Sequence, residues 1–106
     1  MRSRKELSPI LHEIMASKYK NFKVYWQPPT NTKVTYPCVI YERSAIDTDY
    51  GDNLGYKNMV RYTITLIGKE PDNDDLIEKL LDIPYASFDR RFITDNLYHD
   101  VFDLYF

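Results

Sequence analysis

The chain has 106 residues, with one cysteine, three glycines and no long apolar run. The single cysteine, Cys38, excludes an intramolecular disulfide. With only His12 and His99 beside it in the sequence, no zinc-ligand set forms at a useful spacing. A glycine-rich phosphate loop, a nucleophile elbow and a metalloprotease motif are also missing. We therefore expect no metal, no cofactor and no catalytic site.

Long apolar segments are missing as well. No segment approaches the roughly 20 apolar residues that a bilayer-spanning helix needs. The first residues, MRSRKELSPILHEIM, are basic and then apolar, but His12 and Glu13 interrupt the apolar part. We therefore expect no signal peptide and no membrane contact, and the reducing cytoplasm as the default compartment. The formal charge of −2 argues against a strong polyanion binder.

Aromatic residues are abundant: ten tyrosines, five phenylalanines and one tryptophan. Tyrosine has an apolar face and a polar tip, and aromatic residues are enriched at protein–protein interfaces. A small β-rich core also uses aromatic residues. Composition alone leaves both interpretations open.

Hydrophobic periodicity predicts a single α+β domain over residues 1–106. The expected order is α-β-β-β-α-β-β, with two helices packed on a mostly antiparallel sheet of about five strands. Three consecutive strands suggest a meander. The expected elements are a helix over 4–17, strands over 22–27, 37–43 and 58–68, a helix of about ten residues after Pro71, and strands over 85–92 and 97–106.

The first helix contains Pro9, which leaves two alternatives. Either the helix kinks there, or Ser8 caps a shorter helix with Pro9 in its first position. Ser3 followed by Glu6 has the form of a capping box.

The later elements have their own predicted details. Asp72 or Asn73 can cap the second helix. Thr94-Asp95-Asn96 is expected to form the turn between the last two strands. Strict alternation in 85–92 places four side chains on one side: Ala86, Phe88, Arg90 and Phe92.

Residues 44–57, SAIDTDYGDNLGYK, are expected to be a long irregular loop. A calcium loop starting at Asp47 would have Gly51 in the fifth position, Asp52 in the sixth and Asn58 in the twelfth, which is wrong at all three. The remaining interpretations are an acidic hairpin loop and an arm that orders on a partner. Its candidate partner-binding residues are Asp47, Asp49, Tyr50 and Asp52.

Acid–base candidates occur near the end of the sequence, but their spacing is unfavourable for catalysis. His99 and Asp100 are neighbours on a predicted strand, so they point to opposite faces, and the same holds for Arg90 and Arg91. This pattern favours salt bridges and interface contacts. The basic clusters at Arg2, Arg4 and Lys5 and at Lys18, Lys20 and Lys23 are typical of solvated faces.

Two aromatic pairs complete the candidate interface residues. Tyr25 and Trp26 precede Pro28-Pro29, where the prolines deny backbone donors and limit growth of the sheet at that edge. Tyr105 and Phe106 lie at the last positions of the sequence, where a strand frays unless it docks into its own sheet or a neighbour. For the first pair, core packing is the alternative to an interface role.

The phrases KVYWQPP, YPCVIYER, YTITLIGKEPD and FDRRFITDNLYHDVFDLYF follow a short helix in this order. Together with the predicted element order, they resemble the tail terminator or tail completion proteins of long-tailed bacteriophages and prophages. The resemblance covers nearly the whole chain and is one of overall pattern. Its most specific parts are Gln27–Pro29, Tyr36–Cys38 and Asp95–Phe102.

This resemblance implies a structural virion protein, assembled in the bacterial cytoplasm and located at the head-proximal end of the tail. Such proteins form a hexameric ring of identical subunits that caps the tail tube, ends its polymerisation and joins it to the head connector. The implied partners are further copies of the chain, the major tail tube protein and the connector or neck protein. DNA passes through the lumen only as cargo, to which a mildly negative chain would not stick. The alternatives are a head-completion or neck adaptor, and a small non-viral ligand-binding α+β module.

Overall fold

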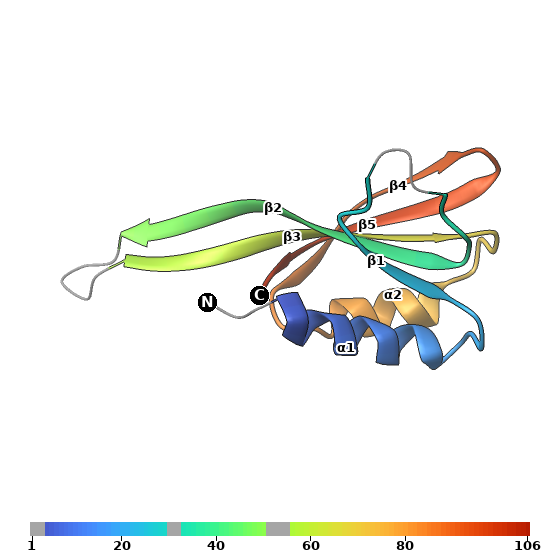
Figure 1. The fold of residues 1–106 in the computed structure, drawn as a ribbon, viewed down its shortest axis with the longest axis horizontal. Coiled ribbons are helices and arrows are strands. Elements are labelled where there is room, and N and C mark those ends of the chain that lie inside the picture. Colours follow the sequence, from blue (N-terminus) through green and yellow to red (C-terminus); the bar gives the residue numbers. More distant parts are fainter. Residues whose placement is uncertain (1–3, 30–32, 51–55) are drawn as a thin grey trace.

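The computed structural model describes residues 4–29, 33–50 and 56–106 (Figure 1). It confirms the expected α+β architecture and the order α-β-β-β-α-β-β. The elements are α1 (Arg4–Ala16), β1 (Lys23–Trp26), β2 (Cys38–Tyr50), β3 (Tyr56–Gly68), α2 (Asp74–Leu81), β4 (Ala86–Thr94) and β5 (Leu97–Tyr105).

The strands form one sheet in the order β1-β2-β3-β5-β4. Three of the four pairings are antiparallel, but β1 runs parallel to β2, from Lys23 opposite Cys38 to Trp26 opposite Tyr41. The expected meander is therefore wrong for β1. The Lys23 amide donates to the Pro37 carbonyl and the Gln27 amide to the Tyr41 carbonyl, so the two strands run in the same direction from one end of the sheet.

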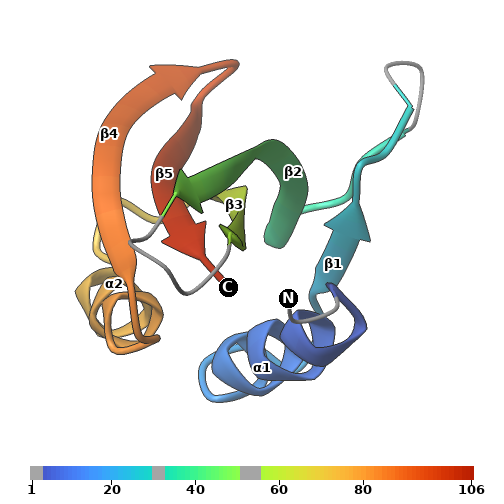
Figure 2. The same cartoon turned by 90° about the vertical axis from the view of Figure 1, so that its left-hand side faces the viewer.

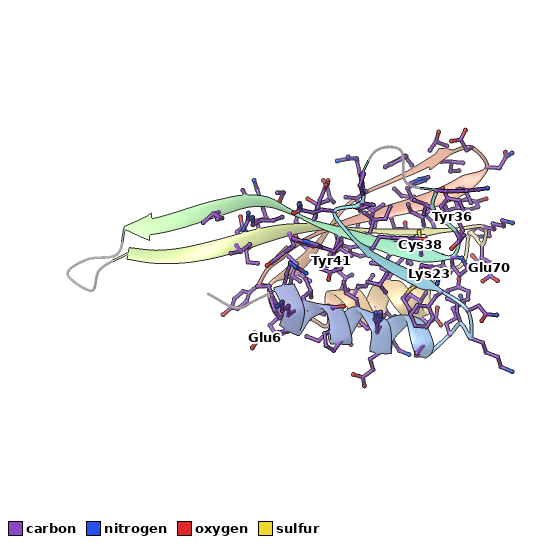
Figure 3. All side chains as sticks on the ribbon, viewed as in Figure 1. Glu6, Lys23, Tyr36, Cys38, Tyr41 and Glu70 are labelled. Carbon is purple, nitrogen blue, oxygen red and sulfur yellow. The ribbon has the colours of Figure 1, made fainter. Side chains whose placement is uncertain are left out.

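Both helices lie on the same face of the curved sheet, with α1 beneath β1 and α2 beneath β4 (Figures 1 and 2). Alternate residues of each strand point toward the helices, as Tyr41 does in Figure 3. Apolar residues spaced three and four apart on the helices meet them. The fully buried large side chains of this core include Leu7, Leu11, Met15, Ile64, Leu66, Leu76, Leu80, Phe102 and Leu104.

Polar contacts join the end of α1 to the start of α2. The Lys18 ammonium lies 3.1 Å from Asn73 Oδ1, 3.4 Å from Glu70 and 3.5 Å from Asp75, and the Tyr19 hydroxyl donates to Asn73 Oδ1. Burial lowers the pKa of Lys18, but its anionic neighbours outweigh that effect and raise it overall. Burial raises the pKa of Tyr19. Charge-assisted hydrogen bonds thus fix the end of α1 against the start of α2.

Two expectations about the helix ends are corrected. α1 starts at Arg4 and contains Pro9 in its interior, so the shorter helix capped by Ser8 is wrong. Asn73 occupies the N-cap position of α2 but makes no side-chain capping bond. Its side-chain amide donates instead to the Glu70 carbonyl and accepts from Lys18 and Tyr19, which follow α1. Ser3, the start of the expected capping box, lies outside the described residues.

The opposite face of the sheet has a smaller apolar cluster. Cys38, Ile67 and Leu97 are buried there, with Tyr25 and Ile40 packed against them. Burial raises the pKa of the Cys38 thiol to about 12. Cys38 therefore packs as a small apolar residue.

A bulge in β4 corrects the predicted alternation. The register shifts between Phe88, which pairs with Phe102, and Arg90, which pairs with Val101. The extra residue reverses the alternation, because two residues of β4 oppose one of β5. Phe88 remains on the helix side, with an edge contact to Phe102 at 5.4 Å. Arg90 and Phe92 lie on the other side.

The bulge also aligns Arg91 with Asp100. Arg91 Nε donates to Asp100 Oδ1 at 2.8 Å, and the Asp100 side chain is only 1% exposed. The same guanidinium donates to the Pro71 carbonyl at 2.6 Å. One side chain of β4 thereby connects β5 to the segment that precedes α2.

Arg91→Met is expected to lower the free energy of unfolding by about 3 kcal/mol, because it leaves the buried Asp100 carboxylate without its cation. The double variant Arg91→Met/Asp100→Leu should recover most of this loss. Arg90→Met is the matched control, since the exposed pair with Asp89 should contribute about 0.5 kcal/mol or less. Urea denaturation measures all three, and equal losses for Arg91→Met and Arg90→Met would contradict the assignment.

Cys38 is expected to resist alkylation in the folded protein. With a pKa of about 12, only about one thiol in 10⁴ is ionised at pH 8, and the side chain is fully buried. Iodoacetamide should react at least about 100-fold more slowly in buffer than in concentrated urea. Mass spectrometry of timed samples measures the rate, and labelling in buffer at the speed of a free thiol would refute the burial.

Candidate functional site

The most conspicuous feature of the molecule is a two-stranded arm formed by the outer parts of β2 and β3 (Figure 1). The two strands pair continuously out to Tyr50 opposite Tyr56, with one bulge at Ser44. We call the paired residues 44–50 and 56–60 the arm. Residues 51–55 lie outside the described residues.

The expected irregular loop over 44–57 is therefore wrong for most of its length. Residues 44–50 continue β2, and β3 begins at Tyr56. Acidic residues are depleted in strands, so Asp47 and Asp49 made this segment read as a loop in the sequence. Among the candidate residues, Asp47, Asp49 and Tyr50 belong to the strand, while Asp52 falls outside the described residues.

The arm extends past the strands that flank the hairpin in the body. The β1 ladder ends at Tyr41, with one more contact from Gln27 Oε1 to the Arg43 amide at 3.2 Å. On the other side, the ladder of β5 ends at Arg61, and the Phe106 amide donates to the Val60 carbonyl at 3.0 Å. Beyond these points the described chain places no third strand beside the ribbon.

An unsupported two-stranded ribbon is marginally stable in water. Its outward projection elongates the molecule to 50 × 30 × 24 Å, with a radius of gyration of 14.8 Å. A compact domain of this length has a radius of gyration of about 13 Å. The exposed side chain of Ile46, at 50%, adds an apolar contact point at the base of the arm. These properties are typical of a segment that packs against another molecule.

Trp26 packs inside the body. Its ring lies 5.0 Å from that of Tyr41 and 6.0 Å from that of Tyr62, and the Arg4 guanidinium lies 4.8 Å above it. Tyr25 points to the opposite face, where its hydroxyl accepts a hydrogen bond from the Thr35 amide at 3.1 Å. Trp26 thus packs against the main core, whereas Tyr25 fixes the loop that leads into β2.

Tyr105 and Phe106 are docked into the chain's own sheet. The Tyr105 amide donates to the Tyr85 carbonyl at 3.3 Å, and the Phe106 ring makes an edge contact with Tyr62 at 6.4 Å. Between the two alternatives for this end of β5, the structure places it in the chain's own sheet. Both side chains remain partly exposed.

A second surface, not identified from the sequence, is the outer edge of β4. This nine-residue strand is the last in the sheet and is exposed along almost its whole length. Four large apolar side chains on or beside it face solvent: Tyr85 at 75%, Ile93 at 62%, Phe88 at 45% and Phe92 at 39%. Alternation in the sequence concerned only the two sides of this strand, and its exposed edge becomes evident only from the strand order.

A groove of about 420 Å³ lies between the outer surfaces of the two helices. Its floor is apolar, formed by Ile10, Ile14 and Ile83, and charged side chains such as Glu13 and Lys79 stand at its rim. Most of its lining residues are exposed, so it is an open surface groove without convergent buried polar groups.

The acid–base candidates near the end of the sequence do not converge. Asp100 is bound to Arg91, whereas the His99 ring stacks on Phe92 at 4.6 Å. Within residues 4–29, 33–50 and 56–106, no group of three His, Cys, Asp or Glu residues is placed to hold a metal ion. In the same residues, no helix is long and apolar enough to cross a membrane.

Comparison with models of known protein families finds no match for this chain, and comparison with curated proteins finds none either.

The different settings of the aromatic residues predict different effects of their removal. Trp26→Ala should lower the free energy of unfolding by about 2–3 kcal/mol, because it removes packing against Tyr41 and Tyr62. Tyr85→Ala, at the exposed edge, should change it by about 0.5 kcal/mol or less. Urea denaturation at low protein concentration measures both, and a destabilising effect at Tyr85 equal to that at Trp26 would contradict the assignment.

Proposed function

We propose that this protein is a tail terminator of a long-tailed bacteriophage or prophage. Copies of the chain close into a ring, with six subunits expected from the family resemblance. The ring sits on the head-proximal end of the tail tube, stops tube growth and offers its other face to the head connector. The protein performs no reaction.

The observation that carries this proposal is the arm. The arm consists of two strands paired with each other, and it protrudes from a body whose core is covered by the helices. Such an element is stable when it lies against a partner. The resemblance to tail terminators supplies the identity of the partners: neighbouring subunits and the tube.

The body is suited to a structural role, in which the shape of the subunit determines how copies assemble. Lys18, which follows α1, binds Asn73 at the start of α2, and Arg91 on β4 binds Asp100 on β5. These contacts fix the helices and strands relative to one another. A ring requires a head-to-tail interface that repeats the same rotation until it closes. A rigid subunit keeps that rotation constant, and the exposed aromatic residues of β4 offer one half of such an interface.

A head-completion or neck adaptor is the alternative within the same virion region. It would bind the portal side and leave the tube end uncovered. The groove between α1 and α2 favours a different alternative, a ligand-binding module, since its volume lies in the range of small-molecule sites. Its exposed lining and lack of convergent polar groups make that alternative weaker than the ring.

The proposal is tested by adding the purified chain to polymerising subunits of the matching major tail protein. Tubes should become shorter and more uniform, with a ring of density at one end in negative-stain electron microscopy. A protein that binds only isolated portal or neck complexes would instead support the adaptor. Unchanged tube lengths together with bare tube ends would refute the terminator.

The arm is expected to be needed for assembly but not for folding. Replacing residues 48–58 by Asn-Gly keeps the ladder up to Asp47 opposite Met59 and closes it with a tight turn. The free energy of unfolding should change by about 1 kcal/mol or less, because a two-stranded ribbon without a third strand is itself only marginally stable. Capping of tubes should be lost, and a truncated variant that still caps tubes would contradict the role of the arm.

A further inference from the structure

The two edges of the sheet differ in how well they are protected against pairing with another strand. β1 is short, with four residues, starts with a lysine and is followed by Pro28-Pro29. Short strands, lysines and prolines are devices that prevent edge-to-edge pairing. β4 is nine residues long and carries exposed Phe88, Phe92 and Ile93. Only one of the two edges is therefore open for pairing.

The backbone of β4 is available as well as its side chains. Asp95 and Asn96 form a two-residue turn with positive φ angles of 53° and 61°, so Thr94 and Leu97 are a hydrogen-bonded pair. In an antiparallel pair such residues alternate with residues that point their amide and carbonyl groups outward. Ile93 and Arg91 therefore direct these groups to the open edge, and no described strand receives them.

We infer that this open edge of β4 receives the arm of a second copy of the chain as an added strand. The inference rests on the proposed ring and specifies its subunit contact. The occupant of an open edge must itself be an extended strand, since only a strand can satisfy a row of amides and carbonyls. The arm offers such strands: in the described part of the chain, no strand lies on the outer side of β2 from residue 44 to 50 or of β3 from 56 to 59.

The two surfaces cannot meet within one molecule. The arm leaves one end of the body, and β4 rises toward the other end (Figure 1). A contact between them must therefore join two copies, and each copy keeps one arm and one β4 edge free for the next copy. That is a head-to-tail contact, which closes into a ring when the rotation permits.

Charge is complementary between the two surfaces. The described residues of the arm, 44–50 and 56–60, contain Asp47 and Asp49 against Lys57, which gives a net charge of −1. β4 contains Arg90 and Arg91 against Asp89, which gives +1. The Arg90 side chain is 63% exposed, and it forms an ion pair with Asp89 of the same strand at 2.7 Å. Complementary charge favours this pairing over arm-to-arm contact.

Pairing of two β4 edges with each other is the competing arrangement. It would close as a two-fold dimer and leave both arms without a partner. The head-to-tail contact covers both unpartnered surfaces at once, and only that contact is compatible with a ring.

The first test removes one outward amide. Ile93→Pro deletes the donor at the open edge, where proline is tolerated because no bond to β5 is lost. Ile93→Thr is the matched control, since it removes the apolar side chain but keeps the donor. Native mass spectrometry should show assembly weakened about tenfold more by Ile93→Pro than by Ile93→Thr, as expected for one lost backbone bond per contact. Equal assembly of the two variants, with unchanged circular dichroism, would overturn the inference.

The second test does not depend on the folding of the proline variant. In a Cys38→Ala background, Ile46→Cys labels the arm and Ile93→Cys labels the β4 edge, both at side chains exposed in the single chain. A short bis-maleimide linker should join the two proteins at least about tenfold more efficiently when they are mixed than when either is alone, since each single variant lacks one half of the contact. Cross-linking of Ile93→Cys with itself would indicate the β4-to-β4 dimer and overturn the inference.

Both tests are read without tail tubes, so the inference and the proposed function fail separately. If the chain caps tubes, but Ile93→Pro does not weaken its assembly and no mixed cross-link forms, the proposed function stands and this contact is wrong. If the mixed cross-link forms but the protein leaves tubes uncapped, the contact is supported and the tail role is refuted. A wild-type chain that stays monomeric at every concentration would overturn the contact.

Discussion

Burial of one sheet face under two short helices is the constraint on which the rest of the molecule depends. The helices cover the sheet from β1 to β4, and their apolar stripes meet alternate residues of the strands. The helices and strands that form this core take up most of the 106 residues. Among the residues that the structure describes, no further strand pairs with the outer edge of β4 or with the ribbon beyond Ser44. These two open surfaces are the ones on which the proposed contacts between copies depend.

The sequence predicted the parts that depend on local pattern and burial. Val60, Tyr62, Ile64 and Leu66 alternate in the predicted strand over 58–68, and the structure buries all four. The order of helices and strands was also correct. In such segments the hydrophobic period coincides with the period of the element, so local and tertiary preferences agree.

The remaining features depend on long-range pairing, for which the sequence has no local pattern. The outer part of β2 contains Asp47 and Asp49, which are poor strand formers, and it forms a strand because β3 supplies the ladder. The parallel direction of β1 is a property of the connection, and the bulge at Asp89 follows from register with β5. The open edge of β4 is defined by strand order alone. The unpartnered surfaces on which function is proposed were accordingly the hardest to predict.

The central claim is that this chain acts by closing on copies of itself into a ring that caps a tail tube. Native mass spectrometry of the full chain, at rising concentration and with tube ends present, tests it most directly. The account expects one closed species, with six copies, that becomes dominant without a ladder of larger forms. A monomer that persists at all concentrations and ignores tube ends, or an open series of ever larger oligomers, would contradict it.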